Sequence, residues 1–177
     1  ARDALDLDGV IFMPAGNPVF KKHIEVSDAH HRVAMCRAAI EDNPAFDVST
    51  LEVDRAGDTY TVDTLETLRA HYPENVELYF IAGADAILTL PQWRDAPRLA
   101  RLASFVGLNR PRSASLQSPQ IAKKLAGTGF RTLFVEAPLF ELSSSDIRKR
   151  ILGNRSVRYL IPPAVLEYIE SVGLYGD

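Results

Sequence analysis

The centre of the chain reads Leu78-Tyr79-Phe80-Ile81-Ala82-Gly83-Ala84-Asp85, an apolar run that a glycine ends and a carboxylate follows. A short run that is apolar at every position is typical of a strand buried on both faces. Such strands belong to parallel sheets, because helical crossovers cover both faces of those sheets. We therefore expect a parallel-sheet strand over 78–82, with Gly83 and Asp85 at its carboxyl end.

Strand-like and helix-like segments alternate on either side of this run. Strands are predicted at 10–13, 46–53, 104–108 and 132–135, and helices at 28–43, 61–71, 121–126, 144–152 and 163–172, with one or two more around Pro91 and Pro97. This alternation predicts an α/β fold, a Rossmann-like doubly wound parallel sheet with helices on both faces. Ligands of such sheets bind beyond the carboxyl ends of the strands.

Length and charge narrow the class of protein. The 177 residues suit one domain, the hydrophobic share is 46% and the net charge is −3. An acidic balance lacks the basic footprint of a general nucleic-acid-binding protein, so we expect no nucleic-acid partner. No apolar run reaches transmembrane length, so we expect no membrane partner. The single cysteine, Cys36, shares a predicted buried helical face with Val33 and Ile40, which fits a reducing cytoplasm.

A run of small hydroxyl residues, Ser143-Ser144-Ser145, stands where the helix over 144–152 should begin, and Arg148 and Arg150 follow about one turn later. The first N–H groups of a helix are unpaired and favour an anion. Arginines add charge-assisted hydrogen bonds to phosphate. The alternative is that Ser143 or Ser144 is an ordinary N-cap and that the arginines are solvated.

Other candidates follow the predicted strands. Asp85 can accept hydrogen bonds from ribose hydroxyls, or it is only an N-cap or a first-turn acid. Trp93, the single tryptophan, can stack on a flat ligand, although a core or rim tryptophan is the commoner case. The helix start over 58–64 offers N–H groups to a carboxylate or phosphate, or it has only a threonine cap with an acidic first turn. Lysines in the loop over 14–23 and Arg110 stand where they could meet phosphate.

These segments, in this order, resemble the bacterial nicotinate-nucleotide adenylyltransferases of the nucleotidyltransferase superfamily. The resemblance covers almost the whole chain, at 10–14, 31–33, 59–65, 80–85, 90–93, 110–111, 143–148, 159–163 and 173–175. It implies transfer of AMP from ATP to nicotinate mononucleotide, giving nicotinate adenine dinucleotide and pyrophosphate in NAD biosynthesis. It also implies Mg²⁺ bound with the ATP, and it leaves a homo-oligomer open.

The resemblance assigns roles on the phosphate side. Ser144, Ser145, Arg148 and Arg110 would hold the phosphates of ATP, and Lys21 would lie near them. Lys21 and Arg148 are therefore the expected catalytic residues. No protein-held metal is expected.

It assigns further roles on the nucleoside side. Gly83 and Asp85 would lie against the ribose of ATP, and Trp93 would stack on the nicotinate ring. Tyr60 and Thr61 would offer backbone groups to the nicotinate carboxylate.

The chain departs from the family in two places. The family's Gly-Gly-Thr-Phe-Asp-Pro-x-His-x-Gly-His segment has no counterpart here, so we expect one nucleotidyltransferase domain over 1–177 without its first strand, phosphate loop and part of its first helix, and with a C-terminal helical part from about 143. We expect that segment to precede Ala1. The family's Pro-Pro-His-Lys loop reads Pro18-Val19-Phe20-Lys21 here.

Two alternatives remain at this point. One is another adenylyltransferase of the superfamily, acting on nicotinamide mononucleotide or pantetheine phosphate. Thr59 to Thr64 and Trp93 favour a nicotinate pocket over the pantetheine substrate. The other is a nucleotide-binding module without catalysis.

Overall fold

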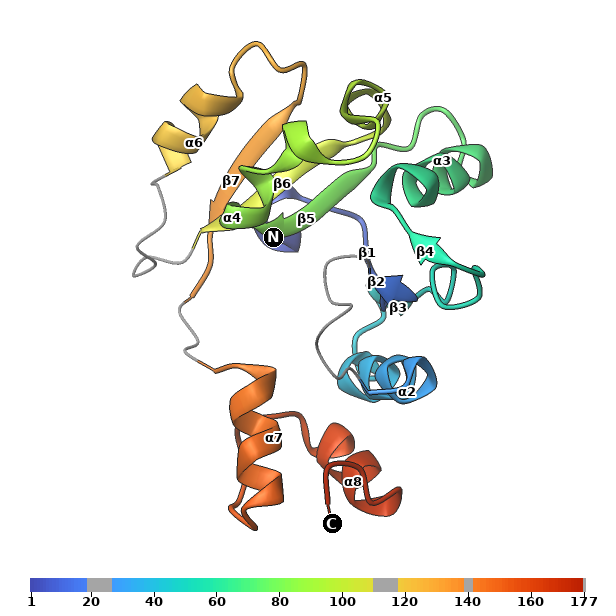
Figure 1. The fold of residues 1–177 in the computed structure, drawn as a ribbon, viewed down its shortest axis with the longest axis vertical. Coiled ribbons are helices and arrows are strands. Elements are labelled where there is room, and N and C mark those ends of the chain that lie inside the picture. Colours follow the sequence, from blue (N-terminus) through green and yellow to red (C-terminus); the bar gives the residue numbers. More distant parts are fainter. Residues whose placement is uncertain (19–26, 110–117, 139–141, 177) are drawn as a thin grey trace. The chain divides into compact units, whose positions relative to one another are not determined.

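The computed structural model describes residues 1–18, 27–109, 118–138 and 142–176 (Figure 1). Its internal contacts gather into two compact units: unit 1 holds Ala1–Leu7 and Thr59–Leu139, and unit 2 holds Asp8–Asp58 and Phe140–Asp177. The organisation as one nucleotidyltransferase domain stays a prediction. Within the described part of the chain, no helix is both long and apolar enough to cross a membrane.

Unit 1 contains the parallel sheet that the sequence predicts around residues 78–82. Strands β5 (Tyr79–Gly83), β6 (Ser104–Asn109) and β7 (Thr132–Glu136) lie in the order β5-β6-β7, and both pairs are parallel (Figure 1). The three strands lie within two residues of their predicted bounds. Gly83 is the last residue of β5 rather than the residue after it.

One glycine in this sheet is required by packing. Gly107 of β6 is paired in register with Phe134 of β7, and a Cβ atom added at Gly107 would lie 2.7 Å from the Phe134 ring. Real Cβ contacts are not that short, so any side chain at 107 would push the aromatic ring away from the strand. The small residue lets Phe134 pack against the core cluster of unit 1.

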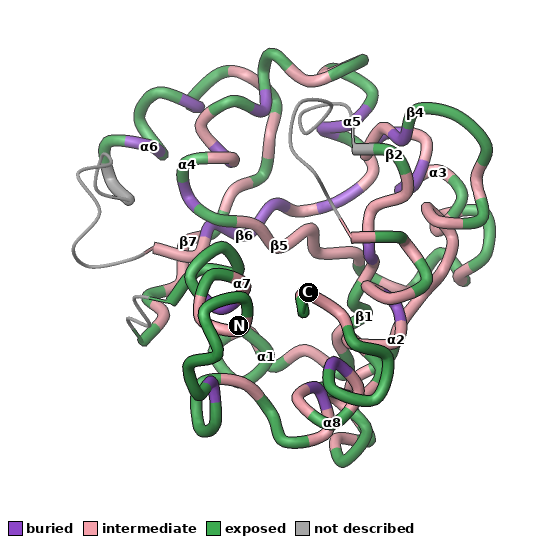
Figure 2. The backbone as a smooth tube through the Cα atoms, turned by 60° about the horizontal axis from the view of Figure 1, so that its bottom comes forward, coloured by how far each residue is buried: buried purple, intermediate pink, exposed green. Residues whose placement is uncertain are grey.

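Helices surround the sheet of unit 1. They are α1 (Arg2–Leu5), α3 (Thr61–His71), α4 (Ala84–Ile87), the 3-10 helix η2 (Leu90–Gln92), α5 (Ala96–Leu102) and α6 (Ser118–Leu125). Pro97 lies in the first turn of α5 and begins that helix, as proline does where no N–H partner is needed. Figure 2 shows the buried segments along β6 and in α4 and α5.

The core of unit 1 draws on these helices and on β6. It consists of Val62, Leu65, Ala84, Ile87, Leu90, Leu99, Ala103, Phe105, Ile121 and Leu125. Burying a large aliphatic or aromatic side chain contributes about 1.5–3 kcal/mol each. Val62 and Leu65 of this core lie about one turn apart on α3, the helix that the sequence predicts over 61–71.

Unit 2 contains a second parallel pair, β1 (Val10–Phe12) with β3 (Phe46–Val48). The predicted strand over 46–53 is too long, because the chain turns after Val48. Thr50 Oγ1 donates to Asp54 Oδ2 at 2.6 Å, and the backbone N–H of Asp54 donates to the Thr50 carbonyl at 2.9 Å. The short strands β2 (Asn17–Pro18) and β4 (Asp58–Thr59) form a two-stranded sheet. The boundary between the two units in the sequence lies within β4, between Asp58 and Thr59.

Three helices complete unit 2: α2 (Ala29–Ile40), α7 (Ser144–Leu152) and α8 (Pro163–Ser171). Helices α2 and α8 pack together, and Val33, Val165 and Ile169 are buried. Cys36 is a free thiol, and the prediction that it is buried is wrong, because the residue is only half-buried. Partial burial still raises the pKa of the Cys36 thiol above its ordinary value.

Candidate active site

The carboxyl end of β5 has open space next to its backbone. Gly83 is exposed, and a Cβ atom added there would meet nothing within 4 Å. Asp85 follows in the first turn of α4 and is also exposed. There is room for a ligand beside the Gly83 backbone. The ribose-binding role of Asp85 stays a prediction, and the alternative of a first-turn acid describes its position in α4.

Trp93 has a fixed orientation at the rim of unit 1. Its Nε1–H donates to Thr89 Oγ1 at 2.9 Å, and the Thr89 hydroxyl donates to the Ala86 carbonyl at 2.8 Å. Its ring meets Phe80 of β5 edge-on, with centroids 5.6 Å apart and planes at 89°. The indole is half-buried. Trp93 therefore fits the commoner case of a core or rim tryptophan, since it packs against the core of unit 1, and its stacking on a ligand stays a prediction.

The helix start predicted to bind a carboxylate is the N-terminus of α3. Of the alternative reading, the threonine cap is wrong, because the N-cap is Tyr60, which makes no side-chain capping bond, and the acidic first turn is correct, because it holds Asp63. Tyr60 and Thr61 are half-buried there. The backbone geometry at Tyr60 is extended, with φ −120° and ψ 139°. As in any α-helix, the N–H groups of the first turn point out of this end and have no partner within the helix.

Sequence reasoning missed a cation beside this helix start. The Arg94 guanidinium carbon lies 4.3 Å from the centroid of the Tyr60 ring, and Arg94 Nη1 lies 3.9 Å from Asp63 Oδ2. Both side chains of the ion pair are partly exposed, so solvent weakens their attraction. The position of Arg94 directly after Trp93 was the available signal. Arg94 adds positive charge near Tyr60 and Thr61.

The serine run begins α7 in unit 2. Ser143 is the N-cap: its hydroxyl oxygen accepts from the Asp146 backbone N–H at 3.1 Å and donates to Asp146 Oδ2 at 2.5 Å. The Asp146 carboxylate also accepts a hydrogen bond from the Ser143 backbone N–H, so the two residues form a capping box with aspartate in place of the usual glutamate or glutamine. The bond from Ser143 lowers the pKa of Asp146 below its ordinary value. Ser144 and Ser145 lie exposed in the first turn.

Replacing Ser143 by alanine is expected to raise the pKa of Asp146 toward its ordinary value, because the hydroxyl that favours the charged form is lost. In the unsubstituted protein the pKa of Asp146 is lower in the folded than in the unfolded chain. Its charged form therefore stabilises the fold at pH values above the pKa of the unfolded chain, and this stabilisation is lost as the pH falls through the pKa of the folded protein. NMR titration of the Asp146 carboxyl in both proteins measures this. An unchanged pKa would show that the capping box does not form.

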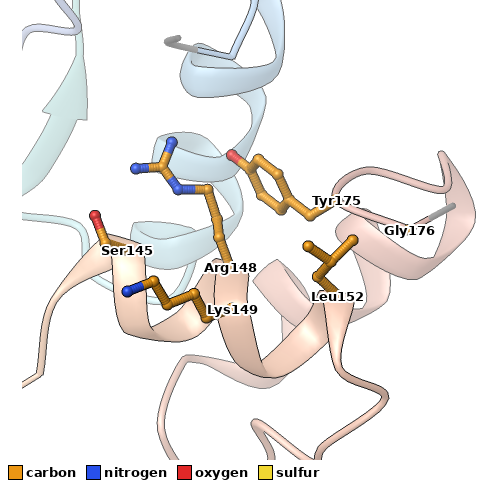
Figure 3. Close-up of a pocket in the computed structure, with 6 residues that line it drawn as sticks. All are labelled: Ser145, Arg148, Lys149, Leu152, Tyr175 and Gly176. Atoms are coloured by element: carbon orange, nitrogen blue, oxygen red, sulfur yellow. The ribbon is translucent and has the colours of Figure 1, made fainter. Parts of the chain in front are cut away.

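Arg148 lies on the next turn of α7. Its side chain is half-buried, and its guanidinium carbon lies 5.9 Å from the centroid of the Tyr175 ring. Ser145, Arg148, Lys149, Leu152, Tyr175 and Gly176 line a pocket between α7 and the end of the chain (Figure 3). The serine N-cap alternative is correct for Ser143, but Arg148 is not a merely solvated arginine. A cationic side chain beside a helix start with two exposed hydroxyls suits an anionic ligand.

The structure groups the predicted residues within each unit. Tyr60, Thr61, Gly83, Asp85 and Trp93 belong to unit 1, and Ser144, Ser145 and Arg148 belong to unit 2. Lys21 and Arg110 lie outside the described residues. Over 1–18, 27–109, 118–138 and 142–176, no group of three or more His, Cys, Asp or Glu side chains is placed to hold a metal ion.

Comparison with known proteins defines the class. Residues 1–150 match the family described as Cytidylyltransferase-like. The structure is similar to that of Plasmodium falciparum nicotinic acid mononucleotide adenylyltransferase complexed with NaAD, with a TM-score of 0.71 at 21% identity over 95% of this chain and 82% of that one. At that identity the likeness concerns the fold, which is the Rossmann-like α/β fold of nucleotidyltransferases.

Closer sequence relatives narrow the class to one family. The chain is 44% identical to a probable nicotinate-nucleotide adenylyltransferase of Corynebacterium jeikeium, over 98% of this chain and 88% of the relative. It is 43% identical to a protein of the same name from Moorella thermoacetica, over 99% and 81% of the two chains. The chain therefore belongs to the nicotinate-nucleotide adenylyltransferase family.

Proposed function

We propose that this protein transfers AMP from ATP to nicotinate mononucleotide, producing nicotinate adenine dinucleotide and pyrophosphate in the NAD biosynthesis of the cytoplasm. The observation that carries the proposal is its identity of 40–44% to relatives named for this reaction, over nearly the whole chain. The anchored indole of Trp93 adds support, since a flat nicotinate ring has a rigid aromatic surface to stack on.

The reaction needs positioning and charge stabilisation rather than a covalent intermediate. A phosphate oxygen of nicotinate mononucleotide attacks the α-phosphorus of ATP, and the bond from that phosphorus to the oxygen bridging to the β-phosphate breaks. Pyrophosphate leaves with that oxygen. Holding the two nucleotides in line supplies much of the acceleration, and cations stabilise the charge that builds on the phosphates.

The phosphate half of the proposed site is the start of α7. Ser144 and Ser145 are exposed in its first turn, and the Arg148 guanidinium is half-buried one turn on. We assign these groups, with Arg110 and Lys21, to the phosphates of ATP. Mg²⁺ enters as part of the ATP substrate, since it keeps most of its water and prefers phosphate oxygens.

The nicotinate half lies at the other helix start. We assign Trp93 to the face of the nicotinate ring and the backbone of Tyr60 and Thr61 to its carboxylate. Two features support the binding of a negatively charged carboxylate here: the α3 N-terminus has no side-chain cap at Tyr60, and the cationic Arg94 lies over the Tyr60 ring. Gly83 and Asp85, at the exposed end of β5, are assigned to the ribose of ATP.

Acceptor choice tests the function. With ATP and Mg²⁺, the purified protein is expected to release pyrophosphate about 100-fold faster with nicotinate mononucleotide than with nicotinamide mononucleotide, because exchanging a bound carboxylate for an amide removes charge-assisted hydrogen bonds. Phosphopantetheine should give no release. Preference for either other acceptor would identify a different adenylyltransferase, and ATP binding without release would identify a binding module.

A further inference from the structure

The C-terminal segment of unit 2 holds a tyrosine in an unusual conformation. After α8 the chain reads Gly173-Leu174-Tyr175-Gly176, and Tyr175 has φ +65°. Residues other than glycine rarely adopt this left-handed region, because their Cβ crowds the backbone. The backbone N–H of Leu174 donates to the Ile169 carbonyl at 3.0 Å, which ties the segment to α8. The backbone immediately before Tyr175 is therefore held against α8.

The other end of Tyr175 is also held. Its hydroxyl lies 2.5 Å from the Ser27 hydroxyl, in a part-buried position. The Ser27 carbonyl accepts from Arg32 Nε at 3.0 Å, and Arg32 Nη2 donates to the Gly16 carbonyl at 3.3 Å. Ser27 is thus connected to α2 and to the loop after β1. Both the backbone and the hydroxyl of Tyr175 are restrained within unit 2.

The restrained ring lies beside Arg148. Figure 3 shows the two side chains extending side by side from α7 and from the C-terminal segment, and the guanidinium carbon lies 5.9 Å from the ring centroid. Guanidinium groups are attracted to aromatic faces and stack on them. An arginine side chain alone has many rotamers, so a fixed ring on one side reduces the number that the guanidinium can occupy.

We propose that Tyr175 is a positioning residue, which orients the Arg148 guanidinium for the phosphates of ATP through its ring and is itself held by Ser27. The inference rests on the proposed function, because it needs Arg148 to bind phosphate. Its physical basis is that a cation already oriented for a phosphate loses less freedom when the nucleotide binds. Tyr175 itself does not touch the substrate.

A double-mutant cycle on ATP binding tests the proposal, with the dissociation constant measured by calorimetry in the presence of Mg²⁺. Tyr175→Leu is expected to weaken ATP binding by about fivefold in the parent, the value of a partly exposed cation–π contact. In an Arg148→Ala background the same change is expected to have no further effect. An equal loss in both backgrounds, or no loss in the parent, would overturn the proposal, because a merely structural role does not depend on Arg148.

Two milder variants examine the anchor. Tyr175→Phe keeps the ring and removes the hydroxyl, while Ser27→Ala removes only its partner. Each is expected to weaken ATP binding by less than Tyr175→Leu, and the two changes together by no more than either alone, since both remove one hydrogen bond. Additive losses would overturn the role of Ser27 as the anchor. Thermal unfolding of each variant shows that it is folded.

Failure of the proposed function gives a different result. If Arg148→Ala binds ATP as tightly as the unsubstituted protein, Arg148 does not bind phosphate and Tyr175 has no positioning role. The acceptor experiment still decides which reaction the protein catalyses. If the parent transfers no AMP but the cycle shows coupling, the positioning role stands in a nucleotide-binding protein.

Discussion

Replacing Arg148 by alanine is expected to lower kcat/KM for ATP by about 100-fold, the usual cost of removing one donor that stabilises a transition-state charge. The half-buried guanidinium lies one turn beyond the exposed Ser144 and Ser145 at the start of α7, the proposed binding site for the phosphates of ATP. KM for nicotinate mononucleotide should change little. Steady-state kinetics of pyrophosphate release, varying each substrate in turn, measures both effects.

Arg155→Ala is the matched control for this prediction. It removes the same charge from the same unit, but Arg155 is exposed, follows the end of α7 and is not among the residues that line the pocket. We expect its kinetics to stay within twofold of the parent, as is usual for a solvated surface charge. Parent-like kinetics in Arg148→Ala would remove Arg148 from the phosphate site.

Replacing Trp93 by alanine is expected to raise KM for nicotinate mononucleotide by about tenfold or more, since stacking of a ring on an aromatic side chain is worth about 1–3 kcal/mol. KM for ATP should rise less than twofold, because the proposed contact is with the nicotinate ring alone. Trp93→Phe should recover part of the loss. The same pyrophosphate assay measures all three values.

Thr89→Val separates stacking from anchoring. It removes the acceptor of the Trp93 Nε1–H and leaves the indole in place against Phe80. KM for nicotinate mononucleotide is expected to rise by about threefold or less in this variant, because only one exposed hydrogen bond is lost.

The contrary result for Trp93→Ala would be a larger rise in KM for ATP than in KM for nicotinate mononucleotide. That result would contradict the assignment of Trp93 to the nicotinate ring.

The regular elements were predictable because their patterns are local. Helix α3 has the predicted bounds Thr61–His71, and α7 has the predicted bounds Ser144–Leu152. Apolar residues at helical spacing and a serine at the helix start determine these elements without help from distant residues. The strand predicted over 46–53 was too long for an equally local reason. Hydrogen bonds between Thr50 and Asp54 turn the chain after Val48, and the alternation of apolar residues does not reveal them.

Parts of the candidate site depend on contacts that periodicity does not encode. The pairing of Tyr175 with Ser27 joins positions separated by 148 residues. The placement of Arg94 over Tyr60 requires two helix starts to meet in space. The sequence also left open whether Ser143 or Ser144 caps α7. Only the bond from the Asp146 backbone to Ser143 shows that Ser143 is the cap, which leaves Ser144 and Ser145 in the first turn of the helix.

The most direct test of the function follows the phosphorus atoms of ATP. Two parallel reactions contain nicotinate mononucleotide and Mg²⁺, one with ATP labelled at the α-phosphate and one with ATP labelled at the γ-phosphate. Adenylyl transfer predicts that the α-label enters a dinucleotide with the mass of nicotinate adenine dinucleotide and that the γ-label leaves in pyrophosphate. Transfer of the γ-label to the nicotinate nucleotide, or a dinucleotide without the α-label, would contradict the account.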